Sequence, residues 1–135
     1  PASEETLASG LHYILMSGRE VFRHAVERLA DACQEILARN GLHVSDVDLF
    51  VGHQANARIL RAVAERIGLP ARALFMNIDR YGNTSSASVP IAFDELAREG
   101  KIDDGALVLT AGFGGGFVWA TSIVRWGGDV RNGAR

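Results

Sequence analysis

The chain has 135 residues, of which 47% are hydrophobic and 22% charged, and its formal net charge is −2. This length suits one globular domain with a substantial core, and the charge gives no case for binding nucleic acid or an anionic membrane. The single cysteine excludes an intrachain disulfide and fits a reducing, cytoplasmic compartment.

The amino-terminal part of the chain predicts strands and helices in alternation. Residues 1–10 are small and polar, which is typical of a linker or a cut edge and does not indicate a secretory signal. Short apolar runs and segments with helical spacing of apolar side chains follow. We expect strands at residues 11–16, 47–51 and 73–78, and helices at residues 20–39 and 55–67.

A third helix and a hairpin are predicted in the carboxy-terminal part. The helix covers residues 84–99, and either it begins near Ser88 with Pro90 in its first turn or Pro90 kinks it. Strands at residues 106–110 and 117–126 flank a glycine turn at residues 112–116, and residues 127–135 form a flexible tail. Residues 105–124 carry no charge, but their glycines and strand-like runs argue against a membrane span.

This order of elements predicts an α/β fold. Strands that alternate with helices form a parallel sheet with crossover helices, and the last two strands add an antiparallel hairpin. The predicted sheet is therefore mixed and mostly parallel.

Two polar side chains stand where a predicted strand gives way to a helix. His53 follows the strand at residues 47–51, and Asn83 follows the strand at residues 73–78. Ligands of such sheets bind at the carboxyl ends of the strands, so both side chains could donate to one developing negative oxygen. Each also has a structural interpretation, His53 as a core or capping histidine and Asn83 as a helix N-cap.

The remaining candidate groups are weaker. The glycine run at residues 112–116 does not open a helix, so it is no dinucleotide motif, but its backbone N–H groups could approach a substrate. Cys33 lies in the apolar stripe of a helix and is interpreted as a core thiol. No zinc or α/β-hydrolase motif is present, and the histidines share no ligand spacing.

Arginines gather on and just after the predicted helix at residues 55–67, at positions 58, 61, 66 and 72. They are consistent with a solvated helix face. The alternative is a docking patch for an acidic partner or a phosphate.

Four segments in sequence order carry a family resemblance: residues 18–22, 53–59, 79–88 and 112–119. Together they closely resemble the C-terminal half of the β-ketoacyl-acyl-carrier-protein synthase III family, the condensing enzymes that begin type II fatty acid synthesis. The resemblance covers nearly the whole chain. It implies the C-terminal half of the thiolase fold, with residues 11–126 as the thiolase-like domain.

The family uses a Cys-His-Asn triad, and the resemblance assigns His53 and Asn83 to its last two members. They would stabilise the enolate of malonyl thioester during decarboxylative condensation with an acyl-CoA primer. The resemblance also implies that the Gly115 backbone N–H serves the oxyanion, that Asn56 contacts pantetheine, and that the arginine patch of Arg58, Arg61 and Arg66 faces acyl carrier protein.

The nucleophilic cysteine of the family lies in an N-terminal half that these residues do not match, and Cys33 matches no nucleophile motif. We therefore expect the isolated chain to be inactive, and to work with that half inside a homodimeric enzyme that uses acyl-CoA and malonyl carrier protein without a further cofactor. The alternatives are a same-fold starter synthase of secondary metabolism, an acyltransferase, or a non-catalytic module that binds carrier protein.

Overall fold

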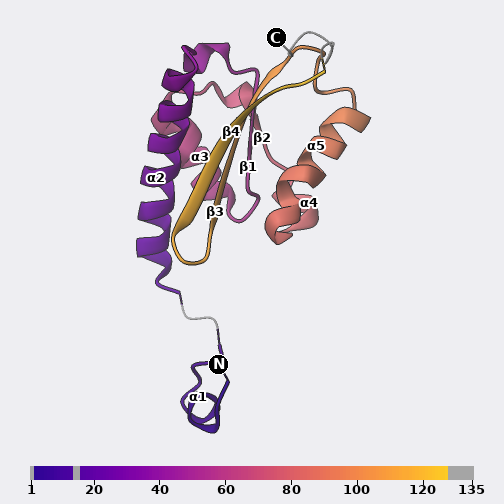
Figure 1. Cartoon of the computed structure of the whole chain (residues 1–135). Coiled ribbons are helices and arrows are strands. Elements are labelled where there is room, and N and C mark those ends of the chain that lie inside the picture. The colour runs from indigo at the N-terminus through magenta and orange to yellow at the C-terminus, as the bar shows by residue number, and fades with distance from the viewer. Residues whose placement is uncertain (1, 14–15, 128–135) are drawn as a thin grey trace, which may run out of the picture.

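A four-stranded sheet with strand order β2-β1-β3-β4 lies between two layers of helices in the computed structural model (Figure 1). The structure describes residues 2–13 and 16–127. Its longer elements are α2 (Gly18–Arg39), β1 (Leu49–Gly52), α3 (Ala57–Ile67), α5 (Ser88–Arg98), β3 (Leu107–Gly114) and β4 (Val118–Arg125). Its shorter ones are α1 (Glu4–Ala8), η1 (Val44–Asp46), η2 (Ala71–Ala73), β2 (Leu74–Phe75), α4 (Ile78–Tyr81) and η3 (Ser85–Ala87).

The pairing of the strands confirms the predicted topology. β1 is parallel to both β2 and β3, and β3 pairs with β4 in an antiparallel hairpin. The register sets Gly52 at the end of β1 opposite Ala111, whereas β3 continues to Gly114. The hairpin therefore extends past the carboxyl end of β1 by about 10 Å, at the usual rise of a strand.

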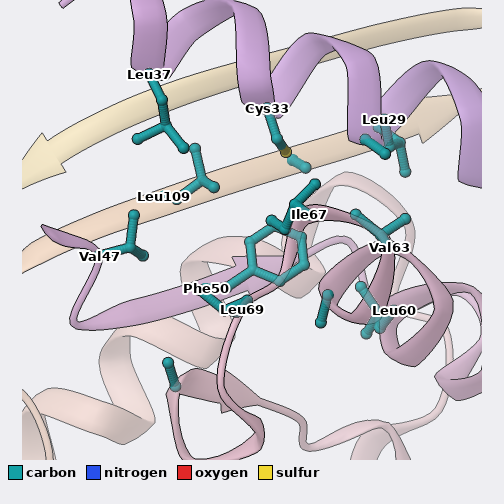
Figure 2. Packing of buried hydrophobic residues seen from close by; sticks show 14 residues of the cluster. Leu29, Cys33, Leu37, Val47, Phe50, Leu60, Val63, Ile67, Leu69 and Leu109 are labelled. Atoms are coloured by element: carbon teal, nitrogen blue, oxygen red, sulfur yellow. The ribbon is translucent and has the colours of Figure 1, made fainter. Parts of the chain in front are cut away.

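Each face of the sheet has its own core. Alternate residues of a strand point to opposite faces, so Phe50 packs toward α2 and α3 whereas Val51 packs toward α5. Figure 2 shows Leu29, Cys33 and Leu37 of α2 directed at Leu109 and at the side chains of α3.

Cys33 is fully buried in the first of these clusters, and burial raises the pKa of its thiol to about 12. The side chain therefore behaves as a core hydrophobe, as its position in the apolar stripe predicts.

The predicted strand at residues 11–16 is wrong for the residues that the structure describes. Leu11, Tyr13 and Met16 are exposed and pair with no strand. A short apolar run forms a buried strand only where a sheet edge accepts it, and the described part of the sheet pairs no segment before β1. Within residues 1–10, the short helix α1 has no buried residue.

Two other boundaries differ from the prediction. The strand predicted at residues 73–78 is only Leu74–Phe75, because the chain turns at Asn77 and Ile78 begins α4. The glycine turn predicted at residues 112–116 is shorter, since β3 runs through Gly112 to Gly114 and pairs there with β4. Glycine at a strand position breaks pairing only where the backbone leaves the extended region.

The alternatives for Pro90 are resolved by α5. This helix begins at Ser88, so Pro90 lies in its first turn, where a missing backbone N–H costs no intrahelical bond. The predicted tail lies outside the described residues from position 128 onward. None of the described helices is both long and apolar enough to cross a membrane.

Candidate active site at the carboxyl edge of the sheet

His53 stands at the carboxyl end of β1, against the neighbouring strand β3. Its backbone N–H donates to the Ala111 carbonyl at 2.7 Å, which continues the parallel ladder by one residue. Gly52 precedes it, and a Cβ atom there would lie 2.3 Å from Cδ2 of Leu60. Glycine therefore allows α3 to pack close against the strand end that carries His53.

The imidazole of His53 is half-buried and faces α5. Its Nδ1 lies 2.6 Å from Oγ of Ser88, 35 residues further along the chain. Burial lowers the pKa of the imidazole from its ordinary value of 6.5. His53 is therefore neutral at neutral pH and offers one ring N–H as a hydrogen-bond donor.

Asn83 is presented by a backbone turn that glycine permits. Gly82 has φ 65° and ψ −157°, a conformation in which other residues are strained. Oδ1 of Asn83 accepts a hydrogen bond from the Ser85 backbone N–H at 2.9 Å, and the residue is exposed. Its amide oxygen thus has a turn-capping role, while its NH2 group has no partner among the described residues.

One segment, residues 83–88, links the two predicted donors. Asn83 is held by Ser85, and His53 is held by Ser88 three residues later. Ser85 has φ 55°, unusual for a non-glycine residue, and the other non-glycine residue with positive φ in the described chain is Phe117 in the β3–β4 turn. Backbone strain of this kind collects at functional sites, and both strained residues lie two positions from a predicted site residue.

A buried polar layer supports this edge. The Gln54 side chain donates from Nε2 to the Gly52 carbonyl at 2.8 Å and accepts from the Asn77 backbone N–H at 3.1 Å. Nδ2 of Asn77 donates to Oε2 of Glu95 at 2.9 Å. The other carboxylate oxygen of Glu95 forms an ion pair with Arg80 of α4, so the buried carboxylate is compensated.

Sequence reasoning missed this layer. Ser88, Gln54, Asn77 and Glu95 are the buried polar residues of the described chain. Four of their hydrogen bonds join residues between 18 and 35 positions apart. The one local signal is Glu95, a carboxylate on the same helix face as the apolar residues Ala92 and Leu96.

Gly115 and Asn56 both lie on exposed backbone turns. Gly115 opens the three-residue turn between β3 and β4, beyond the end of β1. Phe117 closes that turn and contacts the Phe113 ring edge-on at 6.0 Å between centroids. Asn56 is the N-cap of α3, and its Oδ1 accepts from the Arg58 backbone N–H at 2.9 Å. Their roles toward a substrate stay predictions.

The predicted arginine patch is spread along α3. Arg58, Arg61 and Arg66 are all exposed. Arg58 lies in the first turn, beside the candidate site, and its guanidinium sits 5.5 Å from the Phe22 ring centroid. Arg61 is one turn further on the same side, whereas Arg66 is about 12 Å along the axis from Arg58. The patch is therefore graded in its distance from His53, and its docking role stays a prediction.

No group of three or more acidic, histidine or cysteine side chains in residues 2–13 and 16–127 could hold a metal ion. The chemistry available at this edge is hydrogen-bond donation from a neutral imidazole, a primary amide and backbone N–H groups. Such a set suits an anionic oxygen.

Comparison with known proteins identifies the family. Residues 37–126, more than half of the chain, match the family model of the 3-oxoacyl-[acyl-carrier-protein] synthase III C-terminal domain. The chain is 49% identical over 127 residues to the β-ketoacyl-[acyl-carrier-protein] synthase III of Symbiobacterium thermophilum, which covers 94% of this chain and 38% of that protein. The chain thus spans less than half the length of this relative.

Solved structures of related enzymes support the same family assignment. The 3-oxoacyl-[acyl-carrier-protein] synthase III of Aquifex aeolicus superposes with a TM-score of 0.82 at 44% identity, over 84% of this chain and 37% of that one. The priming β-ketosynthase of the R1128 polyketide pathway gives a TM-score of 0.77 at 40% identity, over 84% of this chain and 34% of that one. This chain therefore belongs to the 3-oxoacyl-[acyl-carrier-protein] synthase III family and corresponds to its C-terminal domain.

Proposed function

We propose that this chain is the C-terminal catalytic part of a β-ketoacyl-acyl-carrier-protein synthase III. The complete enzyme would condense an acyl-CoA primer with malonyl carrier protein, with loss of carbon dioxide. The observation that carries the proposal is a pair of polar side chains at one sheet edge, the neutral His53 imidazole and the Asn83 amide. Both are anchored on residues 83–88, and each keeps one nitrogen that has no partner among the described residues.

The proposed role of His53 and Asn83 is to stabilise the negative charge that develops on the substrate oxygen. When the malonyl thioester loses carbon dioxide, the electron pair of the broken C–C bond is delocalised onto the thioester oxygen, and an enolate forms. A ring N–H of His53 and the NH2 group of Asn83 would donate to that oxygen. Removal of one donor from such a site typically costs ~10²–10³ in rate. Because burial lowers the pKa of the imidazole, His53 is neutral at neutral pH and its one ring N–H is available as the donor.

The acyl group that the enolate attacks would sit on a cysteine supplied by the N-terminal half, and Gly115 would offer its backbone N–H to that carbonyl oxygen. Asn56 would contact the pantetheine arm beside it. No cofactor is required, because both substrates bring their own thioester. We place the working enzyme in the cytoplasm as a homodimer of complete chains.

The acidic carrier protein would approach along α3. Arg58 lies nearest to the site, and Arg61 and Arg66 extend the positive surface away from it. Such a surface speeds docking by electrostatic steering.

A chimaera tests the proposal. The chain would replace the matching C-terminal part of the Symbiobacterium thermophilum relative, whose own N-terminal part supplies the rest of the enzyme. We expect condensation of acetyl-CoA with malonyl carrier protein, and a loss of about 10²–10³ in kcat for both His53→Ala and Asn83→Ala. The isolated chain should have no activity.

His43→Ala is the matched control, since His43 is exposed and precedes β1 at the opposite end of that strand. It should retain full activity. A folded chimaera that binds carrier protein without condensing would favour a non-catalytic module, and His53→Ala at full activity would remove His53 from the mechanism.

A second candidate is a starter synthase of polyketide synthesis or a related acyltransferase, favoured by the likeness to the R1128 priming ketosynthase. The same donors would serve it. Primer competition in the chimaera, with acetyl-CoA against longer and branched acyl-CoA, separates the two.

A further inference from the structure

The hydroxyl of Ser88 has two neighbours that together fix its proton. Ser88 is buried, with 2% of its surface exposed, and lies at the first position of α5. Its Oγ lies 3.1 Å from the backbone nitrogen of Gln54 and 2.6 Å from Nδ1 of His53. Among the described residues these are its side-chain partners.

The Gln54 backbone N–H can only donate, so it takes one lone pair of the Ser88 oxygen. If Nδ1 of His53 also donated, the Ser88 proton would point into a buried space with no acceptor among the described residues. An unmade hydrogen bond of this kind is costly. If Ser88 donates to Nδ1 instead, the hydroxyl proton, the Nδ1 lone pair and the Gln54 N–H all have partners.

We propose that Ser88 is a positioning residue that selects the tautomer of His53. The chain of hydrogen bonds runs from Gln54 N–H to Ser88 Oγ, and from Ser88 O–H to His53 Nδ1. The ring proton is then on Nε2, the nitrogen that has no partner among the described residues. The backbone of the residue next to His53 thus determines where the imidazole carries its donor.

The placement of Ser88 makes this orientation rigid. Its Cα belongs to α5, which packs on the sheet through Ala92 and Leu96, whereas His53 belongs to the end of β1. Helix and strand therefore hold the imidazole from two sides, through its Nδ1 contact and through the backbone bond to Ala111.

The catalytic meaning of this inference rests on the proposed function, but the tautomer can be measured without any activity. In the chain labelled with ¹⁵N-histidine at roughly pH 8, above the ordinary pKa of histidine, the ring nitrogen shifts of His53 are assigned by comparison with His53→Gln. We expect a protonated Nε2 and an unprotonated Nδ1. In Ser88→Ala the proton should redistribute toward Nδ1, and in Ser88→Thr, which keeps the hydroxyl, it should stay on Nε2.

The matched control is Ser86→Ala, which should leave the shifts unchanged. Ser86 is an exposed serine two positions away, and its side chain has no hydrogen-bond partner among the described residues. A protonated Nδ1 in the unmodified chain, or unchanged shifts in a folded Ser88→Ala, would overturn the proposal. If Ser88→Ala does not fold, the tautomer of the unmodified chain still decides.

In the chimaera, Ser88→Ala should lower kcat about 10- to 100-fold, the range seen when a group that orients a metal-bound histidine is removed. The KM for malonyl carrier protein should change little, because the hydrogen bond from the imidazole that is lost forms mainly in the transition state. Equal loss in Ser88→Ala and Ser88→Thr would show that packing and not the hydroxyl matters. An inactive parent chimaera would refute the proposed function and leave the tautomer result standing.

Discussion

Asn77 and Glu95 meet in the protein interior, where Nδ2 of Asn77 donates to Oε2 of Glu95 at 2.9 Å. Asn77 precedes α4 and Glu95 lies on α5, so this bond joins two elements on one face of the sheet. Both residues are buried. The bond therefore holds α4, and with it the turn that presents Asn83, against the helix that carries Ser88.

Asn77→Ala should destabilise the fold by about 1.5–3 kcal/mol, the usual value for a hydrogen bond to a charged group. The loss follows because one oxygen of the buried carboxylate is left unpaired. Urea unfolding of the chain measures it. Asn40→Ala is the control, since Asn40 is exposed and donates only to the Ile36 carbonyl at the end of α2. Equal stability of the two variants would contradict the role assigned to Asn77.

Gly52→Ala should destabilise the chain by about 1–3 kcal/mol through overpacking. Its Cβ would lie 2.3 Å from Cδ2 of Leu60, and Leu60 is 2% exposed and cannot swing into solvent. Leu60→Val should recover part of the loss in a double-mutant cycle. Gly112→Ala is the matched control, because a Cβ there meets nothing within 4 Å. If the stability losses of Gly52→Ala and Leu60→Val are additive, the clash between the new Cβ and Leu60 is not the cause of the destabilisation.

Asn83→Asp separates the two ends of the Asn83 amide. The carboxylate keeps an oxygen to accept from the Ser85 N–H, so the turn and the melting temperature should be preserved. It removes the NH2 donor and places a negative charge beside the enolate. In the chimaera we expect a loss of at least about 10²-fold in kcat. Retained activity would leave Asn83 with only its capping role.

The lowered pKa of His53 predicts a pH dependence of stability. The unfolded chain binds a proton at this residue near the ordinary pKa of 6.5, whereas burial lowers the pKa in the folded chain. Between these values the unfolded state binds more protons, so stability falls as the pH is lowered below about 6.5. Below the folded pKa the loss levels off.

Unfolding curves of the chain and of His53→Gln across pH 5 to 8, a window of about 1.5 units on either side of that ordinary value, isolate this contribution. The difference between the two curves should slope in favour of the unmodified chain with rising pH. A flat difference would show that His53 has the same pKa in both states.

The grading of the arginines predicts a rank order in carrier-protein binding. Arg58→Glu should weaken binding most, Arg61→Glu less and Arg66→Glu least, because the distance from the site grows along α3. Each effect should shrink with added salt. Titration of the chimaera with carrier protein at two ionic strengths measures it. Equal effects of all three would indicate a diffuse field, and no effect would remove the patch from docking.

The long helices and the mixed, mostly parallel character of the sheet could be predicted from the sequence because their signals are local and repeated. In α2 the apolar side chains recur at helical spacing, and Leu29, Cys33 and Leu37 are buried as that spacing requires. Gly41 and Gly68 follow the ends of α2 and α3 with positive φ. The family motifs then favoured a catalytic role for His53 and Asn83, which their positions at strand ends alone left as possible caps, and that role stays a prediction.

The wrong boundaries and the missed buried residues share a cause, because each is determined by contacts with residues remote in sequence. Leu11 and Tyr13 form an apolar run that meets no strand, and Ile78 begins a helix because Asn77 is held by Gln54 and Glu95. Gly112 remains in β3 because Ala120 of β4 pairs with it. Ser88 is one small polar residue in a run of several, and only the fold shows that it is the buried one.

The parallel pairing of β1 with β3 also bears on how the chain folds. The Leu107 backbone N–H donates to Oδ2 of Asp48, across a separation of 59 residues, and the whole β1–β3 ladder is comparably non-local. Contacts of this range form slowly. During synthesis β1 would leave the ribosome long before β3 has been made. Its apolar residues Phe50 and Val51 would remain exposed to solvent until then. The sheet edge that carries His53 therefore forms late in folding, after β3 and β4 have been synthesised.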